Sequence, residues 1–456
     1  MIRLSVPALS DASKNILYLA VSLVQLLLMY CLVDAVFYVV SIWANFVIAI
    51  LFFFNREDVL DPRVVFPVFY CMYQTWFPLS VFVGADNVFK TIDGLALSSS
   101  LVYSFIGLVA YIFVCGLFVQ KNSGKSSLMI RRATRPGSSG ELLLIAALLV
   151  VVLICSIVIF NSGFTSKREI NDGAGVEKFI SEFSMLTLTI VALLRAVRLS
   201  MDRLKCDPLI LLVIFVCIFY LALTGERDIF FRLMLCLMLI YYFKMRNFSK
   251  LKLLVFAVGI ALLVPVSQSF KAVMVSGFVG IDFDLNKIFS NEFISASRNI
   301  YSVLYFEAER NPYLLISDIG RAVIPSMFFG EDWFSSANTW FNKEFLLLNG
   351  FSGRTGWGFG LVPEGYVVGG VGGVIAVMSL TAFMISICYR LRLRSEYFLV
   401  FYLFAFSVSI YVIRADVANL LSQMFKIGGL AIFTVFLFER TVSVLFTQLR
   451  VNMERL

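Results

Sequence analysis

A charged tripeptide, Glu226-Arg227-Asp228, stands between two long apolar runs of the sequence. Arginine suits the binding of an anionic ligand such as a phosphate, because its planar guanidinium presents paired N–H donors to phosphate oxygens. An arginine at the bilayer centre costs about 2.5–3.5 kcal/mol or more, so we expect Arg227 near a membrane surface. Two interpretations stay open: a diphosphate-binding arginine held by its flanking acids, or a self-neutralised turn that closes two helix ends.

More arginines occur among aromatic and apolar residues in the segment 269–364: Arg298, Arg310, Arg321 and Arg354. Together they predict a basic pocket that faces a lipid headgroup. Taken one at a time, each favours a scattered charge on a solvated loop. Arg298 lies in a helix-like stretch, and the helix around Arg321 is predicted to stop at Ile324-Pro325.

The same segment ends in the glycine-rich run RTGWGFGLVPEGY, which carries Trp357, Glu364 and Tyr366. At the start of an apolar run, the Glu364 carboxylate can accept a proton or orient a sugar hydroxyl. Its alternative role is a favourable charge at a helix N-terminus. The glycines at 365, 369 and 373 have the spacing that is typical of close helix packing.

The sequence gives weak support for metal binding and excludes chemistry that depends on histidine. Asp282-Phe283-Asp284 spells a D-x-D pair, but no third metal ligand is apparent, so we expect no metal and no cofactor. The chain has no histidine, which removes the usual neutral-pH base and zinc ligand. The tryptophans Trp333, Trp340 and Trp357 can stack on sugars, although anchoring at a membrane interface suits each of them better.

The composition of the chain predicts the kind of element that positions these residues. The chain of 456 residues is 60% hydrophobic and 15% charged, against about 25% charged in ordinary globular chains. Apolar runs of about 18 residues recur and lack the alternation of a barrel, so spanning helices are expected. We therefore predict an all-α polytopic integral membrane protein, with residues 1–456 as a single transmembrane domain.

We predict about twelve spans, at approximately 15–33, 35–54, 64–83, 98–120, 142–161, 177–197, 208–224, 229–243, 253–268, 365–388, 397–413 and 424–446. With both termini in the cytoplasm, most lysines and arginines fall in inside connections, as the positive-inside rule requires. The net charge of +8 is thereby explained without nucleic acid. Between spans nine and ten lies one long external loop, 269–364, in which 292–309 and 338–348 are expected to form short interfacial helices.

Several of these features together resemble the bacterial O-antigen or repeat-unit polymerases, the Wzy family. They are about a dozen spans, Asp61-Pro62 leading into the third, the turn Gly225-Glu226-Arg227, the arginine-bearing loop, and the entry Gly358-Phe359-Gly360 to Gly369-Gly370. The resemblance covers most of the chain as architecture and is loose as motif. It places the fold with the C-type membrane glycosyltransferases.

The resemblance implies an enzyme at the periplasmic face of the bacterial inner membrane. It would transfer a growing glycan from undecaprenyl diphosphate to an incoming lipid-linked repeat unit, without a metal. Arg227, Arg298, Arg321 and Glu364 would then be catalytic, and the residues expected to bind substrate are Glu226, Asp228, Arg310, Arg354, Trp357 and Tyr366. A chain-length regulator and a flippase are the possible protein partners.

Three alternatives remain beside the polymerase. An O-antigen ligase, or another glycosyltransferase that acts on a lipid-linked glycan, would share the lipid carrier. Ligases of this group typically use a loop histidine, which this chain lacks. A lipid-linked oligosaccharide flippase and a non-enzymatic scaffold complete the set.

Overall fold

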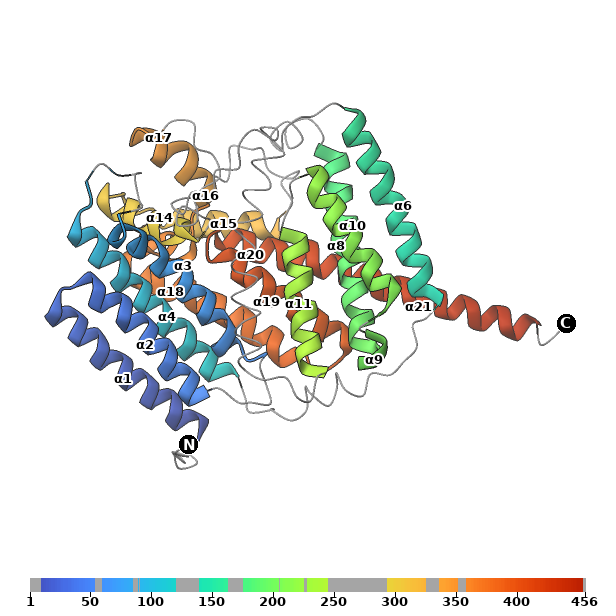
Figure 1. Ribbon diagram of the computed structural model, residues 1–456, viewed down its shortest axis with the longest axis horizontal. Helices are drawn as coiled ribbons and strands as arrows, with labels where there is room; N and C mark the ends of the chain where they lie inside the picture. Colours follow the sequence, from blue (N-terminus) through green and yellow to red (C-terminus); the bar gives the residue numbers. More distant parts are fainter. Residues whose placement is uncertain are drawn as a thin grey trace. The chain divides into compact units, whose positions relative to one another are not determined.

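The computed structural model describes residues 10–53, 60–84, 89, 91–119, 139–162, 175–204, 206–224, 228–244, 293–324, 336–351 and 358–453, and no strand occurs in these ranges (Figure 1). The chain divides into two compact units. Unit 1 comprises Met1–Ser123, Asp282–Arg390 and Val408–Ser422. Unit 2 comprises Gly124–Ile281, Leu391–Ser407 and Gln423–Leu456. The prediction of a single transmembrane domain stays a prediction.

Within the described ranges, nine helices are long and apolar enough to cross a bilayer. They are Asp11–Leu32, Ala35–Phe53, Pro62–Phe82, Gly94–Phe118, Gly140–Asn161, Val176–Arg198, Met201–Thr224, Leu361–Leu391 and Val417–Leu445. The chain is thus a polytopic helical membrane protein. The count of about twelve spans and the long loop stay predictions, and the predicted span 253–268 lies outside the described residues.

Four long helices of unit 1 lie side by side (Figure 1): α1 (Asp11–Leu32), α2 (Ala35–Phe53), α3 (Pro62–Phe82) and α4 (Gly94–Phe118). Helix α3 begins where Asp61 accepts a hydrogen bond from the Arg63 amide, at 2.9 Å, and Pro62 supplies a preset φ. The Arg63 guanidinium also pairs with the Asp61 carboxylate, and both side chains are buried. The Asp-Pro pair therefore begins a span as predicted and neutralises a buried arginine.

Helix α14 (Ile294–Tyr305) packs against α3 and α4, and every residue from Ile294 to Val303 is buried. A short helix within 292–309 is thus present as predicted, and it is covered by other helices of unit 1, while its place at the membrane interface stays a prediction. Its serines suit this packing: Ser297 Oγ accepts from the Phe77 amide at 3.1 Å, and Ser302 Oγ donates to the Arg298 carbonyl at 2.8 Å. Small polar side chains here satisfy hydrogen bonds between closely packed helices instead of meeting water.

The remaining helices of unit 1 come mostly from the segment between residues 293 and 391. They are α15 (Tyr313–Val323), α16 (Ala337–Trp340), the π-helix η2 (Phe341–Phe345), α17 (Leu346–Leu348), α18 (Leu361–Leu391) and α20 (Val417–Ser422). Helix α15 ends just before Ile324-Pro325, as predicted, and the run α16–α17 falls on the second predicted short helix, 338–348.

Helix α18 is broken at Gly369 and Gly370, where the backbone leaves helical geometry. Gly370 has φ +60° and ψ −136°, a conformation that favours glycine. A Cβ built on Gly373 would lie 2.0 Å from the Gly365 carbonyl oxygen. In an unbroken helix these two glycines would stand about 12 Å apart. Residues 361–368, hereafter the half-helix, therefore fold back against the start of the longer part, 371–391.

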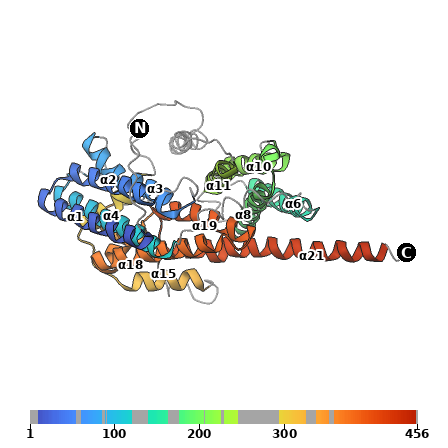
Figure 2. The same ribbon diagram turned by 90° about the horizontal axis from the view of Figure 1, so that it is seen from below.

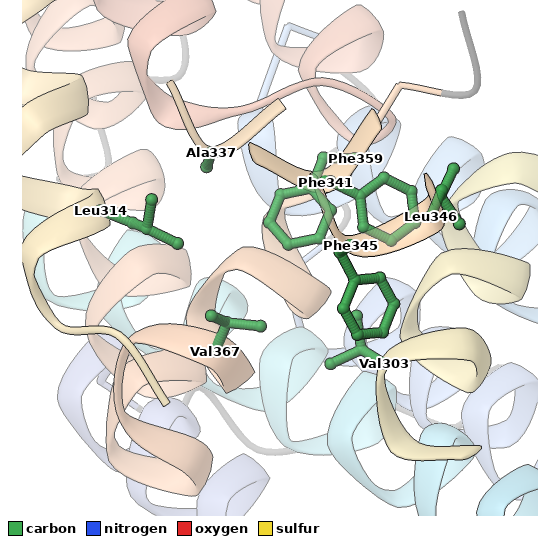
Figure 3. Close-up of a cluster of buried hydrophobic side chains, with 8 residues drawn as sticks. All are labelled: Val303, Leu314, Ala337, Phe341, Phe345, Leu346, Phe359 and Val367. Carbon is green, nitrogen blue, oxygen red and sulfur yellow. The ribbon is translucent and has the colours of Figure 1, made fainter. Parts of the chain in front are cut away.

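An apolar cluster joins α14, α15, the run from α16 to α17, and the half-helix (Figure 3). Its rings are Phe341, Phe345 and Phe359, with the Phe341 and Phe359 centroids 4.7 Å apart. The rings lie close together in Figure 3, with Val303 and Val367 beneath them. This cluster holds the segment that follows α14 on the half-helix.

Phe341→Ala is expected to destabilise the protein by about 3–5 kcal/mol, because it removes a ring that is wholly buried and leaves a cavity. Denaturation of the purified protein in detergent measures this change. Leu348→Ala is the control in the same run of helix, since Leu348 is 85% exposed. Equal losses of stability in the two variants would contradict the packing described.

Unit 2 contains α6 (Ser139–Asn161), α8 (Gly175–Arg198), α9 (Met201–Leu204), α10 (Pro208–Thr224), α11 (Asp228–Lys244), the π-helix η3 (Gln423–Gly429) and α21 (Leu430–Met453). Helix α19 (Glu396–Val412) begins in unit 2 and ends in unit 1. Helices α6, α8, α10 and α11 are neighbours in both views, and α21 is a long straight helix (Figure 2).

The end of α8 carries a buried ion-pair network. Arg198 pairs with Glu141 of α6, Glu396 of α19 and Glu439 of α21. Arg195 pairs with Asp207, at 2.7 Å, and with Glu141. Lys244 Nζ donates to the carbonyls of Ala196 and Val197 at 2.7 and 2.9 Å, so it satisfies the C-terminal end of α8. This network fastens four helices of unit 2 to one another.

Candidate functional site

The break in α18 lies beside the side chain of Arg310. A Cβ built on Gly370 would stand 3.1 Å from Arg310 Nη2 and 3.2 Å from Cζ, so the guanidinium rests directly on the glycine. Arg310 is exposed, and no hydrogen bond or ion pair joins its guanidinium to a described residue. Next along the chain, the Asn311 amide donates to the Val367 carbonyl at 2.8 Å. The break thus holds an arginine whose donors are available to an anion.

Two tyrosines complete this part of the surface. The rings of Tyr103 on α4 and Tyr366 on the half-helix meet edge to face, with centroids 4.9 Å apart. Arg310 lies close enough to Tyr103 to interact electrostatically with its hydroxyl. Both tyrosines are partly exposed. A cation flanked by hydroxyls and aromatic faces can bind a phosphate that carries a sugar. We call Arg310, Gly370, Tyr103 and Tyr366 the α18 cradle.

A buried turn fixes the start of the half-helix. The amides of Phe359 and Gly360 donate to the carbonyls of Arg414 and Ala415 at 3.0 and 2.6 Å. Asn299 Nδ2 donates to the Phe359 carbonyl at 2.9 Å. Gly358 has φ +69°, and a Cβ there would stand 2.1 Å from the Arg414 carbonyl, so only glycine fits. Helix α14 and the residues before α20 together set the position of Glu364.

Glu364 is wholly buried, and its Oε2 accepts from the Val417 amide at 2.9 Å. It lies in the first turn of its own helix, α18, and also accepts from the first amide of α20. Two more buried acids surround it: Asp318 of α15 and Asp416, which precedes α20. These three form the carboxyl cluster.

Helix α15 is amphipathic, and Asp318 lies on its buried face. Leu314, Asp318 and Ala322 recur at intervals of four and are buried, whereas Tyr313 and Ile316 are 78% and 65% exposed. Burial, and next the negative charge of Asp416, raise the pKa of Asp318 to about 8. Burial likewise raises the pKa of Asp416. The exposed Arg321 faces both aspartates and partly opposes these shifts.

The structure places the predicted site residues in different parts of the protein. Arg310 and Tyr366 both belong to the α18 cradle, and Arg321 and Glu364 belong to the carboxyl cluster or its edge. Arg298 is buried in α14. Asp228 is in unit 2, where it begins α11 and lies 3.7 Å from Arg232 of the same helix. The predicted residues Glu226, Arg227, Arg354, Trp357, Asp282, Asp284 and Trp333 lie outside the described residues.

The sequence did not single out three members of the α18 cradle and the carboxyl cluster: Tyr103, Asp318 and Asp416. Asp318 carried a detectable signal, an acid in register with Leu314 and Ala322 on the inner face of an amphipathic helix. Asp416 stands at the N-cap position before Val417, where aspartate is common in any helix. Tyr103 lies within an apolar span and gave no signal.

In the part of the chain that the structure describes, no group of three or more Cys, Asp or Glu side chains is arranged to hold a metal ion. Fold and composition define the class as a polytopic helical membrane protein. Comparison with protein-family models, with curated proteins and with solved structures found no match.

Proposed function

We propose that the protein is a membrane glycosyltransferase that polymerises lipid-linked repeat units, acting at the periplasmic face of a bacterial inner membrane. One observation carries the proposal: the exposed Arg310 guanidinium rests on the break in α18, close to the partly exposed Tyr103, whose ring contacts that of Tyr366. The resemblance to repeat-unit polymerases supports the same reading.

The proposed glycosyl transfer chiefly requires a cation beside the departing diphosphate. The bond between the anomeric carbon of the growing glycan and a diphosphate oxygen breaks, and the acceptor hydroxyl oxygen bonds to that carbon and releases its proton. Negative charge grows on the departing undecaprenyl diphosphate. Arg310 would stabilise this charge, and preorganised electrostatics of this kind is commonly the largest catalytic contribution. Tyr103 and Tyr366 would orient the phosphates or pack against the first sugar.

Other predicted residues take narrower roles. Glu364 is wholly buried, so it reaches an acceptor hydroxyl only if the half-helix moves. Arg321, at the exposed edge of the carboxyl cluster, is a second candidate cation. Arg227 and Arg354 keep the roles that the sequence suggests. A chain-length regulator and a flippase remain the proposed partners.

Arg310→Ala is expected to lower polymerisation by 100-fold or more, the loss of about 2.7 kcal/mol or more that is typical of removing one electrostatic donor. Purified protein in liposomes would receive the lipid-linked repeat unit with EDTA, and products would be resolved by size. Arg390→Ala, which removes an exposed arginine elsewhere in α18, is the matched control. A normal ladder from a folded Arg310→Ala protein would reject this site.

One observation favours a second candidate, a transporter of lipid-linked glycans. Broken helices such as α18 are typical of transporter substrate sites. The same liposomes separate the two functions. Movement of the labelled lipid to the opposite leaflet, with no ladder with or without a divalent metal, would favour transport over polymerisation.

A further inference from the structure

The carboxyl cluster holds three acids in a place that water does not reach. Asp318 and Glu364 are 0% exposed and Asp416 is 1% exposed. They come from three separate elements: α15, the half-helix, and the residue before α20. Burying even one unpaired carboxylate is costly, and such groups gain a proton instead.

Each acid has one oxygen that is satisfied and one that is not. Asp318 Oδ1 accepts from the Ala337 amide at 3.1 Å, Glu364 Oε2 from the Val417 amide at 2.9 Å, and Asp416 Oδ1 from the Asn419 amide at 2.8 Å. Asp318 Oδ2, Glu364 Oε1 and Asp416 Oδ2 are buried and receive no hydrogen bond from any described residue. A buried acceptor without a donor costs about 1–3 kcal/mol. No donor among the described residues reaches these oxygens while all three acids are ionised, and a proton on one of the carboxyl groups would supply one.

Several elements contribute charged or polar groups to the cluster. Arg321 of α15 acts electrostatically on Asp318 and Asp416, and it is exposed. The half-helix contributes Glu364, and the residue before α20 contributes Asp416. Helix α16 offers the backbone N–H of Ala337 to Asp318. Arg321 offsets only part of the effect of burial on the pKa of the two aspartates.

We infer that the carboxyl cluster is a proton-binding site, in which at least one proton is held between Asp318 and Glu364 at neutral pH and fastens α15 and the half-helix to α20. The two carboxyl groups act on each other, and their unpaired oxygens, Asp318 Oδ2 and Glu364 Oε1, are both buried; carboxyl groups hydrogen-bond to each other only if one of them is protonated. The raised pKa of Asp318 agrees with this assignment. The inference concerns proton binding alone and does not depend on glycosyl transfer.

Proton binding at this place makes the packing of α15 depend on pH. The folded pKa of Asp318, about 8, lies above the value of about 3.9 for an unfolded aspartate. The stabilisation is therefore fully present below about pH 4 and is lost as the pH rises through about 8. On the alkaline side the carboxylates repel one another, and α15 and the half-helix loosen together.

Infrared spectroscopy of the full-length protein in lipid nanodiscs tests the inference, because the carbonyl stretch of a protonated carboxyl group is resolved from that of a carboxylate. We expect a protonated-carboxyl band at neutral pH that disappears on raising the pH above about 8. The band should be lost or shifted in Asp318→Asn and in Glu364→Gln. Asp202→Asn, at an exposed acid of unit 2, is the control and should retain the band.

Hydrogen–deuterium exchange gives a second, independent measurement on the wild type. Residues 313–323 and 361–368 should exchange faster as the pH rises, after correction for intrinsic exchange, and Asp318→Asn should remove this dependence. The inference is overturned if wild type shows no protonated-carboxyl band at neutral pH. It is equally overturned if the band survives in folded Asp318→Asn and Glu364→Gln proteins. Failure of the glycosyltransferase proposal would leave both measurements unaffected.

Discussion

Gly373→Ala is expected to destabilise the protein by about 1–3 kcal/mol or more and to displace the half-helix. The added methyl carbon would stand 2.0 Å from the carbonyl oxygen of Gly365 and 3.1 Å from its carbonyl carbon. Both are backbone atoms, so no rotamer change relieves the contact. The chain can accept the methyl group only by separating the half-helix from the longer part of α18, which also opens the α18 cradle.

Gly372→Ala is the matched control, one residue away in the same helix. A Cβ at Gly372 has no atom within 4 Å, so alanine should be neutral or should stabilise the helix by about 0.5–1 kcal/mol. Thermal unfolding in detergent measures stability, and exchange of residues 361–368 reports on the half-helix. If the two variants unfold alike, the close contact between Gly365 and Gly373 does not exist.

The glycines of α18 show what glycine spacing in a sequence can and cannot predict. Their spacing correctly indicated close helix packing, because glycine repeats allow two backbones to approach. It could not indicate that the partner of Gly373 is Gly365 of the same element. That outcome depends on the turn at Gly370, and a glycine inside an apolar run is compatible with either a straight or a broken helix. The sequence therefore did not predict the α18 cradle, although it singled out both Arg310 and Tyr366 as candidate site residues.

Long apolar runs were the most predictable feature. Every predicted span within the described ranges coincides with a helix, since the length and apolarity of a run fix its type almost alone. The carboxyl cluster was less accessible. Asp318 and Asp416 stand far apart in the sequence, and only the packing of α15 on α20 brings them together. A single sequence does not reveal such pairings, so Glu364 was identified without its two neighbours.

The second large effect is expected from Arg198→Met, which should destabilise the protein by about 3–5 kcal/mol. Methionine approximates the volume of the arginine stem but removes the charge that pairs with Glu141, Glu396 and Glu439. Glu141 is 1% exposed, so its charge cannot be transferred to water. Arg195 also contacts Glu141, at 3.2 Å, but it is already paired bidentately with Asp207.

Removing charge from the partners should restore part of the loss, because the cost of Arg198→Met is that of uncompensated buried carboxylates rather than of a missing attraction. Adding Glu439→Gln to Arg198→Met should therefore recover stability, a non-additive result that a double-mutant cycle measures directly. Lys178→Met, which breaks the helical-surface pair with Glu182, is the control and should cost no more than about 1 kcal/mol. Additive effects of Arg198→Met and Glu439→Gln would mean that the network does not act as a unit. The helices α6, α8, α19 and α21 would then be held by apolar packing alone.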